Sequence, residues 1–81
     1  MPQVMLHNTH RPEDCAALTE EWQAHGTPPA FQGRTFFCTC PSGEHGVFVQ
    51  LEADDPAVAL ASLPRRFRAG TRVYTGEPMT L

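Results

Sequence analysis

The alternation of apolar and polar positions divides this chain into four short strands separated by other elements. Strands are predicted over residues 2–8, 36–40, 45–51 and 71–75. In the first of them Val4 and Leu6 fall on one side and Met5 and His7 on the other, which indicates a sheet with two different faces. The middle two strands are separated only by Pro-Ser-Gly-Glu, so we expect a hairpin with a short polar turn.

A first helix is predicted between the first two strands. It opens at residues 11–14, where a proline followed by two acidic residues suits the first turn of a helix. Cys15, Leu18 and Trp22 form one apolar stripe along it. Gly26 is placed to end this helix at about His25.

A second helix is predicted between the last two strands. Asp54, Asp55 and Pro56 repeat the pattern of acidic residues before a proline, and Gly70 marks the end. Pro64 lacks a backbone donor and should break or kink this helix near Ser62.

The predicted order of elements is β-α-β-β-α-β over a single domain of residues 1–81. This order is that of the ferredoxin-like fold, an α+β architecture. We therefore expect a four-stranded antiparallel sheet with two helices on one face. A domain of this length buries little more than half of its unfolded surface, so a dimer interface or a bound ion would help to stabilise it.

The parity of the hairpin assigns its two faces. If the turn has four residues, Cys40 lies opposite His45 with Cβ atoms roughly 5 Å apart, and their face also carries Leu51. We assign that more apolar face to the helices. The opposite face would then expose an apolar patch, and such patches typically mark an interface. We expect a homodimer through this sheet face, with interface residues Met5, Phe37, Phe48 and Tyr74.

The same topology brings soft metal ligands together. In this order of elements the first strand ends, the first helix begins and the hairpin turns at one edge of the sheet. His10, Cys15, Cys40 and His45 should therefore gather there. Two thiols and two imidazoles form a complete tetrahedral set for zinc, and they could also hold nickel or copper.

Three carboxylates could orient the ligand imidazoles from a second layer: Glu13, Asp14 and Glu44.

Two other functions compete with metal binding. One is an enzyme acting on a small organic molecule, with His10 or His45 as general base and a cysteine as nucleophile. The other is a structural or regulatory dimer in which these side chains only pack, since buried thiols are common core groups.

Composition narrows the choice of partners and compartment. The net charge of −3 argues against nucleic acid, which requires a basic surface. No stretch of the sequence is long and apolar enough to cross a bilayer, so no membrane association is expected. Three cysteines are too few for a secreted disulfide scaffold and fit a reducing compartment. We expect a cytoplasmic protein.

Two motifs carry a resemblance: His10-Arg-Pro-Glu13-Asp14-Cys15 and Cys40-Pro-Ser-Gly43-Glu44-His45. With them the chain resembles a group of short, uncharacterised bacterial ferredoxin-like proteins, over most of its length. More loosely, it is similar to the dimeric α+β barrel superfamily, which includes small isomerases, monooxygenases and a nickel-binding branch. The resemblance implies the fold and a dimer but no defined activity. Cys38 departs from the group's pattern and leaves open which thiol would act.

Overall fold

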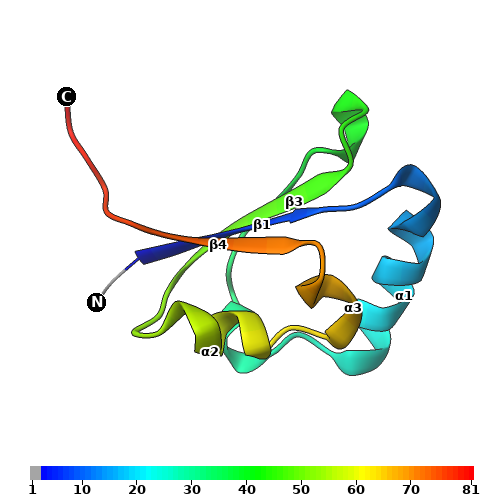
Figure 1. Cartoon of the computed structure of the whole chain (residues 1–81), viewed down its shortest axis with the longest axis horizontal. Helices are drawn as coiled ribbons and strands as arrows, with labels where there is room; N and C mark the ends of the chain where they lie inside the picture. The colour runs from blue at the N-terminus through cyan, green and yellow to red at the C-terminus, as the bar shows by residue number, and fades with distance from the viewer. Residues whose placement is uncertain (1–2) are drawn as a thin grey trace.

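A four-stranded antiparallel sheet in the order β2-β3-β1-β4 forms the centre of the computed structural model, which describes residues 3–81 (Figure 1). The strands are β1 (Gln3–Thr9), β2 (Phe36–Cys38), β3 (Gly46–Glu52) and β4 (Thr71–Gly76). The helices are α1 (Cys15–His25), α2 (Pro56–Ala61) and α3 (Arg65–Arg68). In Figure 1 the helices lie on one side of the sheet. The predicted α+β class is confirmed.

β1 lies in the middle of the sheet and pairs with β3 on one side and β4 on the other. Its predicted start at residue 2 lies outside the described residues. Val4, Leu6 and Asn8 are buried along one face of β1, in the alternation expected of a strand with a single covered face. Within the described residues no helix has the length and apolar character needed to cross a membrane.

The core fills the space between one end of the sheet and the helices. Phe31, in a short 3-10 turn over Pro29–Phe31, is 1% exposed and Leu51 is completely covered. Around them pack the other buried apolar residues of this cluster: Val4, Leu6, Val49, Ala59 and Leu63. Trp22 packs against the cluster from α1, and its indole N–H donates to Thr27 Oγ1 at 3.2 Å.

The helices lie in the predicted segments of the chain, but there are three of them in the described residues and not two. A 3-10 turn over Pro12–Asp14 leads into α1, which ends at His25 before Gly26 with φ of 83°. The second predicted helix is two helices, because Pro64 stands between α2 and α3. The predicted break near Ser62 is confirmed: Ser62 directly follows the last residue of α2.

The hairpin is shorter than predicted. β2 ends at Cys38, so the prediction that Cys40 and His45 form a ladder pair across a four-residue turn is wrong. Pro41 has no backbone N–H to continue the ladder, and the chain turns into a 3-10 turn over Cys40–Ser42 instead. The register is nevertheless the predicted one, with Cys38 opposite Val47.

The face of the sheet away from the helices carries the expected aromatic side chains. Phe37 is paired with Phe48 and is 67% exposed, and Tyr74, paired with Met5, is 49% exposed. Phe48 stacks on His7, with ring centroids 3.9 Å apart and planes at 5°.

Candidate metal centre

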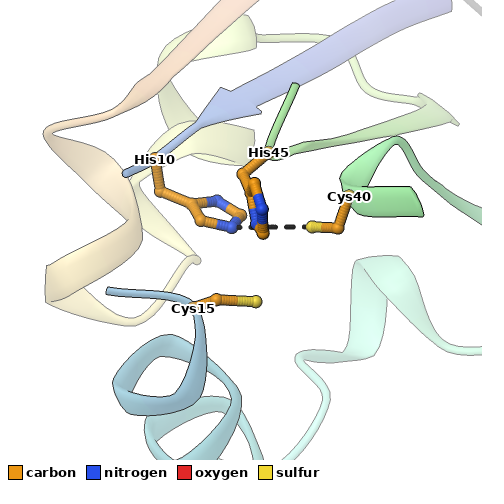
Figure 2. Close-up of side chains that lie close together, drawn as sticks. All are labelled: His10, Cys15, Cys40 and His45. Atoms are coloured by element: carbon orange, nitrogen blue, oxygen red, sulfur yellow. Dashed lines mark hydrogen bonds between the residues drawn. The ribbon is translucent and has the colours of Figure 1, made fainter. Parts of the chain in front are cut away.

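Four side chains that are far apart in the sequence meet at one end of the sheet (Figure 2). They are His10, Cys15, Cys40 and His45, and each offers a ligand atom that lies within 4.8 Å of all the others. All four are half-buried. Figure 2 shows the two imidazoles and the two thiols directed toward a common region between them. The predicted convergence of these four residues is confirmed.

Backbone pairing between β1 and β3 places the two histidines. The ladder joins Thr9 to Gly46, and it continues one step further through a hydrogen bond from His10 N to His45 O at 3.1 Å. His10 also continues the face of Leu6 and Asn8, because alternate residues of a strand point the same way. The two imidazoles therefore stand on the helix side, in an edge-to-face arrangement with centroids 5.7 Å apart.

The turn after β2 places Cys40. Thr39 N donates to Gly46 O at 2.9 Å, and the Thr39 hydroxyl donates to the carbonyl of Glu44 on the far side of the turn. Gly43 adopts φ of 93°, which favours glycine, and allows the chain to reverse. Cys40 therefore lies beside His45 although the two are not a ladder pair.

Close approach of the backbones requires a glycine next to His45. A Cβ at Gly46 would lie 2.7 Å from the carbonyl oxygen of Asn8, a distance that only a backbone shift could relieve. Because Gly46 is also buried, any such shift would move the histidine that precedes it.

Cys15 reaches the group from the other layer of the molecule. It is the first residue of α1, and the 3-10 turn Pro12–Asp14 connects it to the end of β1. In Figure 2 its thiol points from the helix toward the side chains of the sheet. The group therefore bridges sheet and helix, and an ion held there would connect the two.

The spacing of the ligand atoms suits a tetrahedral ion. Bond lengths of 2.0–2.1 Å to nitrogen and 2.3 Å to sulfur imply separations of about 3.3–3.8 Å between ligand atoms. Cys40 Sγ and His10 Nε2 lie 3.8 Å apart. The largest separation in the group is at most 4.8 Å, so side-chain adjustments of about 1 Å would close the tetrahedron.

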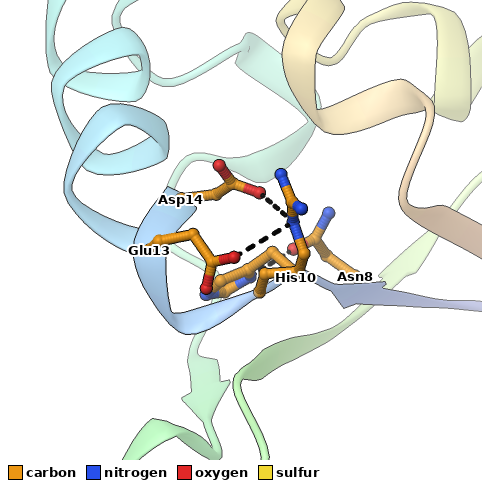
Figure 3. Close-up of polar contacts among 5 residues, drawn as sticks. Asn8, His10, Glu13 and Asp14 are labelled. Atoms are coloured by element: carbon orange, nitrogen blue, oxygen red, sulfur yellow. Dashed lines mark hydrogen bonds and ion pairs between the residues drawn. The ribbon is translucent and has the colours of Figure 1, made fainter.

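Asn8 orients the imidazole of His10 (Figure 3). The Asn8 amide nitrogen donates to Phe67 O at 3.3 Å and to Thr71 Oγ1 at 3.0 Å, which leaves its oxygen facing His10 Nδ1 at 2.9 Å. That oxygen accepts a hydrogen bond from Nδ1–H, so Nδ1 carries the proton and the lone pair of His10 is on Nε2, the atom beside Cys40. An amide in this role fixes the tautomer that a metal ligand needs.

The predicted second layer of carboxylates is arranged differently. Glu13 and Asp14 both lie beside Arg11, whose Nε is 3.5 Å from Glu13 Oε1 and 3.2 Å from Asp14 Oδ2 (Figure 3). Glu44 is exposed on the turn. The sequence reasoning missed Asn8. Its only signal was a polar residue two positions before His10 on the buried face of a strand.

The electrostatic surroundings keep His10 in its ligand form. Its pKa lies below the ordinary value of 6.5, first because burial disfavours the charged imidazolium and second because His45 is close. Asp14 acts in the opposite direction and raises this pKa. The net lowering favours the neutral imidazole, which is the form that binds a metal.

His45 carries an unsatisfied nitrogen. Its Nδ1 is buried and has no hydrogen-bond partner. Within the described residues one other buried side-chain atom has no hydrogen-bond partner, Glu21 Oε2, and that atom lies 3.0 Å from Arg66 Nε in an ion pair. A buried nitrogen without a partner is costly, and an ion or a ligand would satisfy it.

The third thiol of the chain and the imidazole of His7 lie outside the group. Cys38 is exposed on β2, and His7 is occupied with Phe48 on the opposite face of the sheet. The structure therefore separates the two thiols of Cys-Thr-Cys and brings only Cys40 to the other donors.

Comparisons of the chain with protein-family models, curated proteins and solved structures found no match. The resemblance of its motifs stays a prediction.

Proposed function

We propose that this chain is a metal-binding protein whose ion is held by His10, Cys15, Cys40 and His45. The observation that carries the proposal is the mutual approach of these four donors within 4.8 Å. The lone pair of His10 beside Cys40 and the unsatisfied nitrogen of His45 support it independently. A site with four protein donors has no open position, which is typical of structural ions rather than catalytic ones.

Zinc is the ion that we propose. Two thiolates and two neutral imidazoles suit its borderline-soft character and its tetrahedral preference, and two thiolates cancel its charge in a half-buried site. Nickel and copper accept the same ligands and are the alternatives.

The direct test is elemental analysis of protein purified without a chelator, followed by replacement of the ion with cobalt. We expect one equivalent of metal per chain, and cobalt bound by two thiolates should show intense thiolate charge-transfer absorption. Protein that takes up no zinc, cobalt, nickel or copper at stoichiometric concentration would refute the proposal.

The chain offers a matched control for the thiol. Cys40→Ser should abolish stoichiometric binding, whereas Cys38→Ser, two residues away and outside the group, should preserve it. The two variants have identical composition. If Cys38→Ser rather than Cys40→Ser removes the metal, the ligand assignment is wrong.

An enzyme acting on a small organic molecule is the second candidate, and one observation favours it. A cavity of about 300 Å³ adjoins the group, and His10, Cys15 and Cys40 form part of its wall. A thiol next to an imidazole can serve as a nucleophile. Alkylation of Cys40 many times faster than that of Cys38 in metal-free protein would support this candidate, and equal rates would remove it.

We also propose that the chain has the ferredoxin-like fold and forms a homodimer through Met5, Phe37, Phe48 and Tyr74. The order of strands and helices along the chain supports the first statement. The exposure of Phe37 and Tyr74 on the face without helices supports the second. Light scattering at micromolar concentration tests the dimer, and Phe37→Ser should yield a monomer. A monomeric parent protein would contradict it.

A further inference from the structure

The cavity beside the candidate metal centre has apolar walls from both layers of the molecule. Its volume is about 300 Å³, and it lies between α1, α3 and the helix-facing side of the sheet. Apolar side chains of all three form its walls: Leu6, Leu18, Trp22, Phe36, Val47 and Phe67. His10, Cys15 and Cys40 lie in its wall as well. The cavity is thus a pocket with one polar end.

No Asp, Glu, Lys or Arg side chain contributes to this wall in the described part of the chain. Most of its polar groups already have partners. Asn8 makes three hydrogen bonds, the Thr71 hydroxyl bonds to Phe67 O, and the Thr19 hydroxyl donates to Cys15 O. An ionised ligand would therefore lose its hydration without gaining a counter-charge, which is strongly unfavourable. The chemistry of the wall selects an uncharged molecule.

The aromatic residues of the wall favour an aromatic ligand. Trp22 meets Phe36 and Phe67 edge to face, with centroids 5.4 Å and 5.3 Å apart. Such rings also offer faces and edges to an inserted ring. A cavity of roughly 150 Å³ with apolar walls accommodates benzene. Twice that volume matches two fused rings or one ring with a short substituent.

The open state of this pocket leaves large apolar side chains in contact with solvent. Phe36 is 37% exposed although it lies on the helix-facing side of the sheet. A ligand in the pocket would cover these apolar walls and add dispersion contacts to them. The concave shape and the absence of charge fit a small molecule.

We propose that this pocket binds a small uncharged aromatic molecule, with one end of the ligand against His10 and Cys40. The proposal goes beyond the metal site and does not require a bound ion. The metal would close the polar end of the pocket, whereas Trp22 and Phe36 would contact the body of the ligand.

Trp22 provides the readout, because it is the only tryptophan of the chain and part of the wall. We would titrate 2-naphthol, and as its charged counterpart 2-naphthoate, into ¹⁵N-labelled protein, with and without zinc. The Trp22 indole N–H resonance should shift with saturation by 2-naphthol in both states. 2-Naphthoate should bind about tenfold more weakly or worse.

Substitutions that fill the pocket with a larger side chain, here called filling variants, locate the binding site. Val47→Phe from the floor of the pocket and Thr19→Phe from α1 should each weaken 2-naphthol binding about tenfold or more. Val58→Phe makes the same change as the first variant at an exposed position outside the pocket and should leave binding unchanged. Two filling variants are used because one of them could fold poorly, and cobalt titration reports separately whether the metal site survives.

Four results would overturn the proposal. One is the absence of any saturable shift of Trp22 with 2-naphthol up to its solubility limit. A second is equal binding of 2-naphthoate. A third is binding of 2-naphthol that persists in every folded filling variant. The last is a shift of the pocket resonances with protein concentration alone, which would make a second copy of the chain the occupant. Failure to bind zinc would affect only the metal proposal, because the titration is also done without metal.

Discussion

The two ends of the helix–sheet interface differ in how completely side chains fill the space between the layers. At one end Val4, Phe31 and Leu51 are at most 1% exposed and fill the space between the layers. At the other end the same face of the sheet continues into Asn8 and His10, and a cavity of about 300 Å³ lies beside them. The first end holds itself together by apolar packing. The second has apolar walls around a cavity and four donors that could hold an ion between sheet and helix.

The largest expected effect distinguishes the packed end from the site. Phe31→Ala should lower the free energy of unfolding by about 3–5 kcal/mol, because it removes a completely packed ring. The loss should be the same with and without zinc, since Phe31 is not part of the donor group. Thermal unfolding under both conditions measures it. A loss confined to the zinc-bound state would mean that the two ends are not independent.

The next effect concerns the site end. Zinc present about 1,000-fold above its dissociation constant should stabilise the protein by about 4 kcal/mol. For a domain of this size that corresponds to an increase in Tm of roughly 15–30 °C. Cys40→Ser should lose this increase while its metal-free Tm stays near that of the parent.

Cys38→Ser is the control for this measurement and should show the full increase. An unchanged zinc effect in Cys40→Ser would contradict the ligand assignment, whereas the loss of the effect in both variants would indicate a general disturbance of the β2–β3 turn.

A smaller effect tests the orientation of His10. Asn8→Ala removes the acceptor for His10 Nδ1 and should weaken metal binding by about 10- to 100-fold. Asn8→Asp retains an acceptor at the same place and should preserve most of the affinity, although it loses the donors to Phe67 and Thr71. Competition titrations with a chelator give both affinities. Equal affinities in Asn8→Ala and the parent would show that His10 needs no such support.

These contrasts also explain what the sequence could predict. Strand parity and the order of elements depend on local pattern and chain connectivity, and they were enough to bring His10, Cys15, Cys40 and His45 together. The position of Cys40 in a 3-10 turn rather than on β2 depends on Pro41 and on the hydrogen bonds of Thr39, which act against continuation of the ladder.

The role of Asn8 could not be predicted in the same way. Its three partners, His10, Phe67 and Thr71, include two that are about sixty residues away, and they become neighbours only when β4 pairs with β1. The cavity was equally hidden, because it results from the relative placement of α1, α3 and the sheet. Spacing along the chain led us to expect that Glu13 and Asp14 would orient an imidazole. In the structure both carboxylates lie beside Arg11 instead, and the sequence pattern does not show which of the two neighbours they contact.

The smallest expected effect is the response of the metal-free protein to pH. The pKa of His10 in the folded state lies below its ordinary value of 6.5, so the unfolded chain takes up a proton first as the pH decreases. The contribution of this group to stability is therefore fully present above pH 6.5 and decreases as the pH falls below it. His10→Gln, which cannot be protonated, should show a weaker decrease in Tm over the same interval.

With zinc bound, the decrease should be steeper, because protons then also compete with the ion for two imidazoles and two thiolates. Comparison of the four pH profiles, for parent and His10→Gln with and without zinc, separates the two causes. A metal-free parent that loses less stability than His10→Gln on acidification below pH 6.5 would show that the charged form of His10 is the favoured one. The polar end of the pocket would then be built to hold an imidazolium, and a site for a divalent cation there would be untenable.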